Sequence, residues 1–396
     1  MKSRNTVALP VLVALCMAHL LNDLLQSTVT ATYPMIKADL DLNFTQIGSI
    51  TLVYQIAASV FQPVVGLLFD KHPFRGSLLL ATTFTFLGIL GLSFSDSLAT
   101  IYASVFVVGL GSSILHPEAS RIASLASNGK RGLAQSIFQV GGNFGGSVGP
   151  LLIALIVAPA GRRNLLWFAI FSIASYAAVT VIGRWFKHFL EQHGRGEAAK
   201  ISRPRPLGIW ATVGTIAVIV ILIVSKYIYL ESIRSYYTFY LIDKFGITVS
   251  ASQLCLFSFL FATAAGTLVG GPVGDRIGRK WVILLSILGT APFSLAMPYA
   301  GFAGTLVLGF CSGFMISSAF PAILLYAQEL LPGRLGLVSG LFFGFAFGVG
   351  GIASAILGNF IDIYGIAAVY KTVCFSPLLG LVALFLPSLS PNQPCS

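Results

Sequence analysis

Charge is scarce in this 396-residue sequence, because Asp, Glu, Lys and Arg together make up 9% of it, whereas hydrophobic residues make up 56%. A soluble domain of this length needs far more polar surface to face water. The mean hydropathy is +0.87, and apolar runs of about 20 residues, each long enough to cross a bilayer, recur along the chain. The composition therefore excludes a soluble protein and predicts an all-α membrane protein with many spans.

Cysteine is also scarce. The five cysteines include no CxxC pair and no Cys/His set with the spacing of metal ligands. A phosphate-binding loop and an attached nucleotide-binding domain are absent as well. We therefore expect no metal site, no disulfide framework and no cofactor.

Acidic residues are fewer than basic ones, 13 against 24. In a membrane protein this excess is more typical of cytoplasmic loops than of nucleic-acid binding. The loops DKHPFRG, SNGKRG and GDRIGRK and the polar segment 187–206 carry it, and AGRRN (160–164) is the one clear exception on the opposite side. The basic, apolar N-terminus lacks a small-residue cleavage site, which indicates a retained first helix. Both termini are thus expected in the cytoplasm.

Twelve transmembrane helices are predicted, separated by Pro, Gly and clusters of charge. They are placed at 7–33, 44–69, 76–95, 98–122, 133–158, 164–186, 208–241, 249–271, 281–299, 303–327, 336–360 and 366–386.

The twelve helices divide into two related halves. A shift of 205 positions lays GLLFDKHPFR (66–75) on GPVGDRIGRK (271–280) without a gap, and a shift of about 203 lays KRGLAQS (130–136) on GRLGLVS (333–339). We expect an N-terminal six-helix bundle at 1–186, a cytoplasmic linker at 187–207 and a C-terminal six-helix bundle at 208–396. Two such bundles are typical of transporters that bind substrate at their interface.

The same two loops, 66–75 and 271–280, resemble the GxLaDRxGRR signature of the major facilitator superfamily. GGSVGP (145–150) resembles the start of its antiporter motif. The strings HLLNDLLQS, HPEASR, GLAQSIFQVGGNFGGSVGP, SKYIYLESIRSYYTFYL and YAQELLPGRLGLVSGLFFGFAFGVGG are similar to bacterial drug exporters of the fosmidomycin-resistance type. This similarity covers nearly the whole chain, and it implies the major facilitator fold and export of fosmidomycin-like phosphonates across the bacterial inner membrane.

The first helix carries a polar stripe, because His19, Asn22, Asp23 and Gln26 recur at intervals of three and four. An ionised carboxylate in hydrocarbon is costly, so such residues usually face the protein interior. We interpret Asp23 and His19 as candidates for proton coupling, and Asn22 and Gln26 as candidates for substrate binding. The alternative is that the stripe only bonds neighbouring helices.

The fourth helix carries HPEASR. Glu118 and Arg121 are three residues apart and can form an ion pair on one helix face. Two interpretations remain open: a structural or gating pair, or a role of Glu118 and His116 in proton relay and of Arg121 in substrate binding.

The seventh helix has a second stripe, formed by Tyr227, Glu231 and Arg234, with Lys226 on another face. Lys226 and Arg234 are candidates for holding an anionic group, since both are cations in a low-dielectric setting. Glu231 is a candidate for proton coupling, and Tyr227 and Tyr237 for the cavity wall. Alternatively, Arg234 and Glu231 neutralise each other and Lys226 extends toward the membrane surface.

Two further sets complete the predicted site. Gln139 and Asn143 on the fifth helix offer amides to a substrate or to a neighbouring helix. The charges of the two signature loops are interpreted as a conformational latch, in which ion pairs hold one conformation and break in the other: Asp70, Arg75, Asp275, Arg276 and Arg279.

Together these residues predict a secondary transporter, not an enzyme, that exports small drug-like or anionic compounds in exchange for protons by alternating access. The expected partners are a small-molecule substrate, protons and the bilayer, with no nucleic acid, and the expected state is a monomer. An uptake symporter of the same fold, sodium in place of protons, and more remotely a membrane sensor or enzyme are the alternatives.

Overall fold

The structure, a computed structural model, describes residues 8–197, 207–331 and 335–387, with all their side chains except those at positions 131, 193–197, 271, 272, 275 and 335. Within these ranges every regular element is helical, and twelve helical runs are long and apolar enough to cross a membrane. The predicted all-α fold with twelve spans is therefore confirmed. The runs match the predicted positions closely, except that the first extends to Asp39 and the sixth to Gln192.

The first half holds six spans. Its elements are α1 (Leu9–Ala31), α2 (Tyr33–Asp39), α3 (Phe44–Lys71), α4 (Ser77–Phe94), α5 (Leu98–Ala126), α6 (Arg131–Leu152), the π-helix η1 (Ile153–Val157), α7 (Ala158–Ala160), the 3₁₀ helix η2 (Arg162–Phe168) and α8 (Ala169–Glu197). The first span joins α1 and α2, the fifth joins α6, η1 and α7, and the sixth joins η2 and α8.

The second half holds the other six. Its elements are α9 (Ile209–Phe245), α10 (Val249–Ile277), α11 (Arg279–Leu288), α12 (Ala291–Ala296), η3 (Met297–Tyr299), α13 (Phe302–Ser317), α14 (Ala319–Leu330), α15 (Leu335–Tyr364), α16 (Ile366–Val373) and η4 (Ser376–Phe385). The predicted linker at 187–207 is helical up to Glu197, and positions 198–206 lie outside the described residues.

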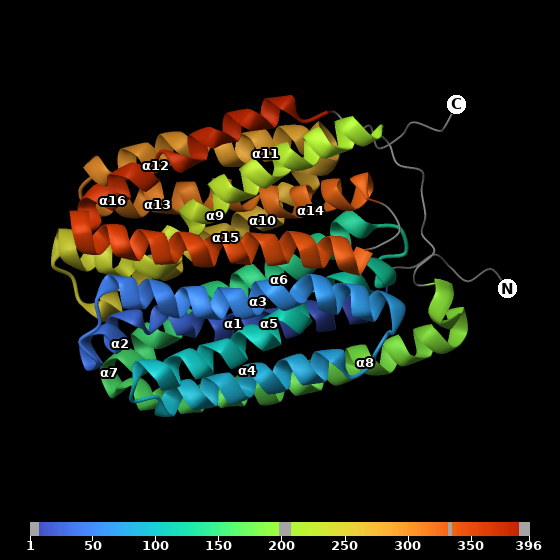
Figure 1. The fold of residues 1–396 in the computed structure, drawn as a ribbon, viewed down its shortest axis with the longest axis horizontal. Coiled ribbons are helices and arrows are strands. Elements are labelled where there is room, and N and C mark those ends of the chain that lie inside the picture. The colour runs from blue at the N-terminus through green and yellow to red at the C-terminus, as the bar shows by residue number, and fades with distance from the viewer. Residues whose placement is uncertain (1–7, 198–206, 332–334, 388–396) are drawn as a thin grey trace.

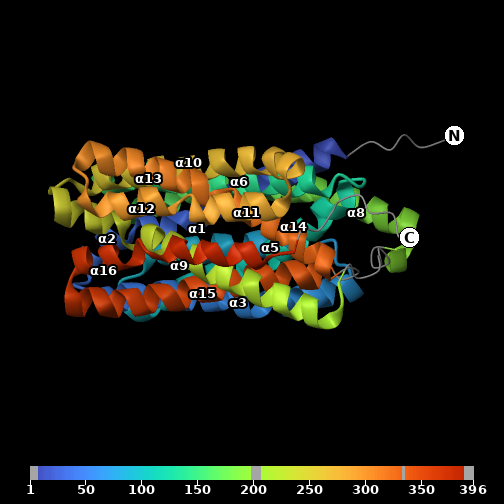
Figure 2. The ribbon, with the colours of Figure 1, turned by 90° about the horizontal axis from the view of Figure 1, so that it is seen from above.

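The two halves lie one above the other in Figure 1, with α1–α8 below and α9–α16 above. Their most extensive contacts are those of α3 with α15 and of α6 with α10, and these helices lie side by side in Figures 1 and 2. The 205-residue shift carries the start of α3 at Phe44 onto the start of α10 at Val249, and carries α6 onto α15. The two interfaces are therefore equivalent under the sequence repeat.

Glycine rows on α6 and α15 allow these helices to approach α1 and α3 closely. A Cβ atom on Gly145 of α6 would lie 1.9 Å from the Leu20 carbonyl oxygen of α1, and one on Gly340 of α15 would lie 2.5 Å from the Gln62 carbonyl oxygen of α3. Small residues at helix contacts are typical of membrane proteins, where packing replaces the hydrophobic effect between helices.

Helices α3 and α15 cap each other at both ends. At one end, Asp70 of α3 accepts a hydrogen bond from the Leu337 N–H near the start of α15 (3.1 Å). At the other end, the Asp362 carboxylate of α15 accepts from the backbone N–H groups of Phe44 (3.0 Å) and Thr45 (2.7 Å) at the start of α3. The first N–H groups of a helix have no partner inside it, so each aspartate satisfies donors of the other half. We call these the Asp70 end and the Asp362 end.

Replacing Gly145 by alanine should lower the thermal unfolding temperature of the purified protein, because the added methyl group meets backbone that cannot rotate away, and overpacking costs about 1–3 kcal/mol. The matched control is Gly146→Ala, where the added Cβ has no neighbour within 4 Å. There, the higher helix propensity of alanine should keep or raise stability. Equal unfolding temperatures for the two variants would contradict the close contact of α1 and α6.

Candidate functional site

A cavity of about 100 Å³ lies between the two halves. It is lined from the first half by residues of α1, α3, α5 and α6, and from the second half by residues of α9, α10, α14 and α15. The lining residues are His19, Asp23, Gln26, Ser27, Thr30, Tyr54, Gln55, His116, Gln139, Gly142, Asn143, Gly146, Tyr227, Glu231, Arg234, Leu260, Thr263, Phe320, Phe343 and Phe347. The stripes predicted on the first and seventh helices thus face one shared cavity.

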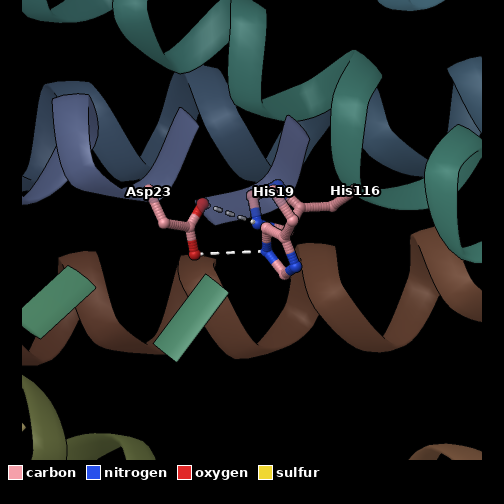
Figure 3. A group of neighbouring side chains, drawn as sticks. All are labelled: His19, Asp23 and His116. Carbon is pink, nitrogen blue, oxygen red and sulfur yellow. Dashed lines mark ion pairs between the residues drawn. The ribbon is translucent and has the colours of Figure 1, made fainter. Parts of the chain in front are cut away.

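Asp23 is the centre of a polar cluster on the first-half wall. Its Oδ2 lies 3.2 Å from His19 Nε2, one turn earlier on α1, and its Oδ1 lies 3.6 Å from His116 Nε2 of α5 (Figure 3). The side chain of Asp23 is 24% exposed, whereas both histidines are 3% exposed. The carboxylate is therefore the member of the cluster that faces the cavity.

Backbone carbonyls fix the orientation of both histidines. His19 Nδ1 lies 2.7 Å from the Phe138 carbonyl oxygen, and His116 Nδ1 lies 3.0 Å from the Ser112 carbonyl oxygen. A carbonyl only accepts, so each Nδ1 carries the hydrogen and each Nε2 is directed at Asp23. An Nε2 lone pair facing a carboxylate is repulsive, and a positive charge between them removes the repulsion.

That charge can be a proton or a metal ion, since the three groups place ligand atoms within 4.8 Å of one another. Asp23 presents a different oxygen to each histidine. This arrangement suits a hydrogen bond from His19 and an ion pair with His116 better than three ligands converging on one ion, where metal–ligand distances are about 2.0–2.2 Å. The three residues therefore form the candidate proton-coupling cluster.

Several buried polar atoms of the cavity wall have no hydrogen-bond partner among the described residues. These atoms are Gln26 Nε2, Gln55 Oε1, Gln139 Oε1 and Glu231 Oε2. Buried polar groups are normally paired with protein, water or ligand. Four such atoms around one cavity therefore indicate a site for a polar ligand.

The second-half wall combines charge with aromatic rings. Within the described chain no ion pair joins Arg234 to Glu231, whose Oε1 accepts from the Ser235 hydroxyl (3.2 Å). Beside them, the Phe343 ring packs against Phe320 (5.1 Å between centroids) and against His116 (5.3 Å). The cavity can thus hold a molecule that is polar on one side and apolar on the other.

Five predicted site residues do not line the cavity. Asn22 bonds both Asp23 and Thr85, so it supports the carboxylate from behind. Glu118 and Arg121 are buried in a two-point ion pair, with Nε–Oε2 at 2.9 Å and Nη2–Oε1 at 2.8 Å. Tyr237 packs in a buried aromatic group beside Tyr240. The fifth residue, Lys226, is buried against the ring of Phe320.

The predicted latch residues are found in different situations. Asp70 binds across the halves as described, whereas Arg279 pairs with Glu329 of its own half. Arg75 and Arg276 are exposed, and no ion pair of either is found in the described part of the chain. The side chain of Asp275 lies outside the described residues.

Several residues that line the cavity are not among the site residues predicted from the sequence. Ser27 and Thr30 continue the spacing of the α1 stripe, so the same pattern contained them. No such spacing pattern includes Tyr54, Gln55 or the three phenylalanines. Aromatic residues in particular do not stand out, because the sequence has 31 phenylalanines and every predicted span contains an aromatic residue.

Two matching bundles around a polar cavity define a secondary transporter. The sequence profile of the Major Facilitator Superfamily matches residues 15–230 and 232–395. The chain is 51% identical over 377 residues to the fosmidomycin resistance protein of Escherichia coli K12, covering 95% of this chain and 92% of that one. It is 39% identical over 392 residues to the uncharacterized MFS-type transporter YfnC of Bacillus subtilis 168, covering 97% and 94%.

Among solved structures, the fucose:proton symporter FucP of E. coli superposes with a TM-score of 0.68 over 97% of this chain and 100% of that one, at 16% identity. This similarity confirms the fold. The chain belongs to the Major Facilitator Superfamily. It is therefore a membrane transporter of small molecules, related to a bacterial fosmidomycin resistance protein, and not an enzyme.

The Glu118–Arg121 pair offers a test of a structural role. Glu118→Gln leaves a buried guanidinium without its partner, which costs about 3–5 kcal/mol and should lower the thermal unfolding temperature markedly. Glu118→Met combined with Arg121→Met should recover most of that stability. The control is Glu191→Gln in the exposed Lys187–Glu191 pair, which should change stability little. If the double variant is no more stable than Glu118→Gln, the pair is not primarily structural.

Proposed function

We propose that this transporter exports small anionic or amphiphilic compounds, including fosmidomycin-like phosphonates, in exchange for protons by alternating access. The observation that carries the proposal is the cavity itself, where the His19–Asp23–His116 cluster faces Arg234 across a hollow with unpaired polar atoms. The identity to the E. coli fosmidomycin resistance protein supports the substrate class.

In this mechanism Asp23 is the coupling group. His19 and His116 hold and relay the proton, and Glu231 is a second acidic group on the opposite wall. Arg234 holds the anionic substrate, while Gln26, Gln139, Asn143 and Tyr227 supply hydrogen bonds around it. Exchange requires that the binding of the proton and the binding of the substrate exclude each other. Asp23 can meet this requirement because it is the most exposed member of its cluster, so the substrate can contact it directly.

We place the protein in the bacterial inner membrane as a monomer, with both termini and the Asp70 end in the cytoplasm. Basic residues of the loops at this end support that orientation, since cytoplasmic loops are rich in Lys and Arg: Lys71, Arg75, Lys130, Arg276, Arg279 and Lys280.

Asp23→Asn should abolish export driven by a pH gradient in proteoliposomes, because the amide cannot take up the coupling proton. The matched control, Asp96→Asn, changes an exposed aspartate that does not line the cavity and should transport like wild type. Undiminished pH-driven export by Asp23→Asn would remove this residue from coupling. Resistance of pump-deficient cells that express the wild type, in contrast to sensitisation, distinguishes export from uptake.

Asp70 and Asp362 are proposed as latches of the two ends. Alternating access requires each end to open in turn, and opening separates the start of α15 from Asp70 or the start of α3 from Asp362. Hydrogen bonds to a charged group contribute about 1.5–3 kcal/mol, enough to shift a two-state population about tenfold or more.

Asp362→Asn should therefore open the Asp362 end, and Asp70→Asn the other. Spin labels at Asp41 and Tyr364 report on the Asp362 end, and labels at Phe74 and Trp281 report on the Asp70 end. All four positions are exposed. In a cysteine-free background, each aspartate variant should lengthen the inter-label distances at its own end only. The two-latch mechanism would be rejected if both variants lengthened the distance at the same end, or if neither variant changed either distance.

A further inference from the structure

Lys226 is a buried lysine without an anionic partner among the described residues. It lies within the membrane-spanning helix α9, its side chain is 2% exposed, and it makes no ion pair or hydrogen bond within the described residues. Charged groups inside a membrane protein are costly and usually paired. The Nζ atom of Lys226 lies over the ring of Phe320, 5.3 Å from its centroid, in a cation–π geometry.

Phe320 contacts both Lys226 and the cavity. Its ring belongs to the cavity wall and packs against Tyr227 and Phe343, which also line the cavity, whereas Lys226 does not line it. Rotation of this ring is the simplest movement that would expose Lys226 to the cavity.

The backbone at Phe320 is suited to such a movement. The tenth span is broken between α13, which ends at Ser317, and α14, which begins at Ala319. Pro321 has no N–H to donate to the Ser317 carbonyl, and a proline at this position interrupts the helical ladder. That carbonyl is instead 3.3 Å from the Thr267 hydroxyl.

The break is also connected to the first half. Asn143, a lining residue of α6, donates to the Thr267 hydroxyl (2.7 Å). The hydroxyl hydrogen of Thr267 is shared between the carbonyls of Thr263 (2.9 Å) and Ser317. A substrate that takes the Asn143 amide therefore alters the hydrogen bonds at the break beside Phe320.

We propose that Phe320 closes a second anion subsite, and that on substrate binding it swings aside so that Lys226 holds a tetrahedral oxyanion of the phosphonate class. The inference rests on the proposed function. Lys226 and Arg234 are eight residues apart on α9, about 12 Å along the axis. They therefore select elongated compounds, with the oxyanion at Lys226 and a planar polar end at Arg234, whose guanidinium fork matches planar groups.

The first experiment measures binding to the detergent-purified full chain by calorimetry. The probes are fosmidomycin and its phosphonate monoester, which carries one negative charge fewer. Lys226→Gln should weaken binding of fosmidomycin about 10- to 100-fold, since hydrogen bonds to charged groups contribute about 1.5–3 kcal/mol. It should weaken binding of the monoester much less, and Lys226→Arg should retain most of the affinity.

The control is Lys244→Gln, which removes a cation of the same helix that bonds the Pro298 and Ala300 carbonyls away from the cavity. Lys226→Gln should be at least as thermally stable as wild type, because it removes an unpaired buried charge, so lost affinity cannot be ascribed to unfolding. Wild-type affinity for fosmidomycin in Lys226→Gln would overturn the subsite. So would the finding that Arg234→Gln, and not Lys226→Gln, removes the difference in affinity between fosmidomycin and its monoester. Failure of the wild type to bind fosmidomycin would instead refute the proposed substrate class.

The second experiment tests the ring as a barrier. In a cysteine-free background, Lys226→Cys should react slowly with a charged methanethiosulfonate reagent, and much faster when combined with Phe320→Ala. Equal rates in the two proteins would show that Phe320 does not close the subsite.

Discussion

The whole arrangement depends on one constraint, that a polar group inside a membrane span must find its partner within the protein. Asp23, His116 and Glu231 are therefore turned inward from three different helices, and the surface between the two bundles is where they can meet. Most polar groups there are paired with a neighbour. Among the described residues, several of the buried polar atoms left unpaired lie in the cavity wall, on Gln26, Gln55, Gln139 and Glu231, so the constraint that organises the fold also helps to mark the candidate binding site.

The same constraint makes the interface both specific and separable. Backbone N–H groups at the start of α3 and α15 are satisfied by aspartates of the opposite half, and the glycine contacts between these helices bring backbones together without interlocking large side chains. Caps at a helix end can be exchanged for water when that end opens, whereas an ion pair in the centre could not. The two aspartates proposed as latches therefore lie where water can replace their contacts.

The fold and part of the site could be predicted from the sequence, because hydrophobic length and helical spacing are local properties. The stripe of His19, Asp23 and Gln26 is visible without coordinates, and so is the stripe of Glu231 and Arg234. The ion pair of Glu118 and Arg121 is one of two interpretations that the sequence leaves open, and only the structure shows that neither residue lines the cavity. Long-range choices are not visible at all, since Asp362 caps a helix 317 positions earlier in the chain. Phe320 acquires its position from a proline break and from packing, neither of which periodicity encodes.

The proposed exchange of an anion for a proton makes a particular demand on this cavity. An anion held in the cavity attracts a proton through space, and in a low-dielectric site this attraction favours binding the two together rather than in turn. Mutual exclusion must therefore arise from contact. In the proposed mechanism Asp23 meets that requirement, because a substrate donor that bonds its carboxylate occupies an oxygen that would otherwise accept from protonated His19. In the proposed mechanism, whether proton and substrate bind in turn or together therefore depends less on the net charge of the cavity than on which charged groups the substrate contacts.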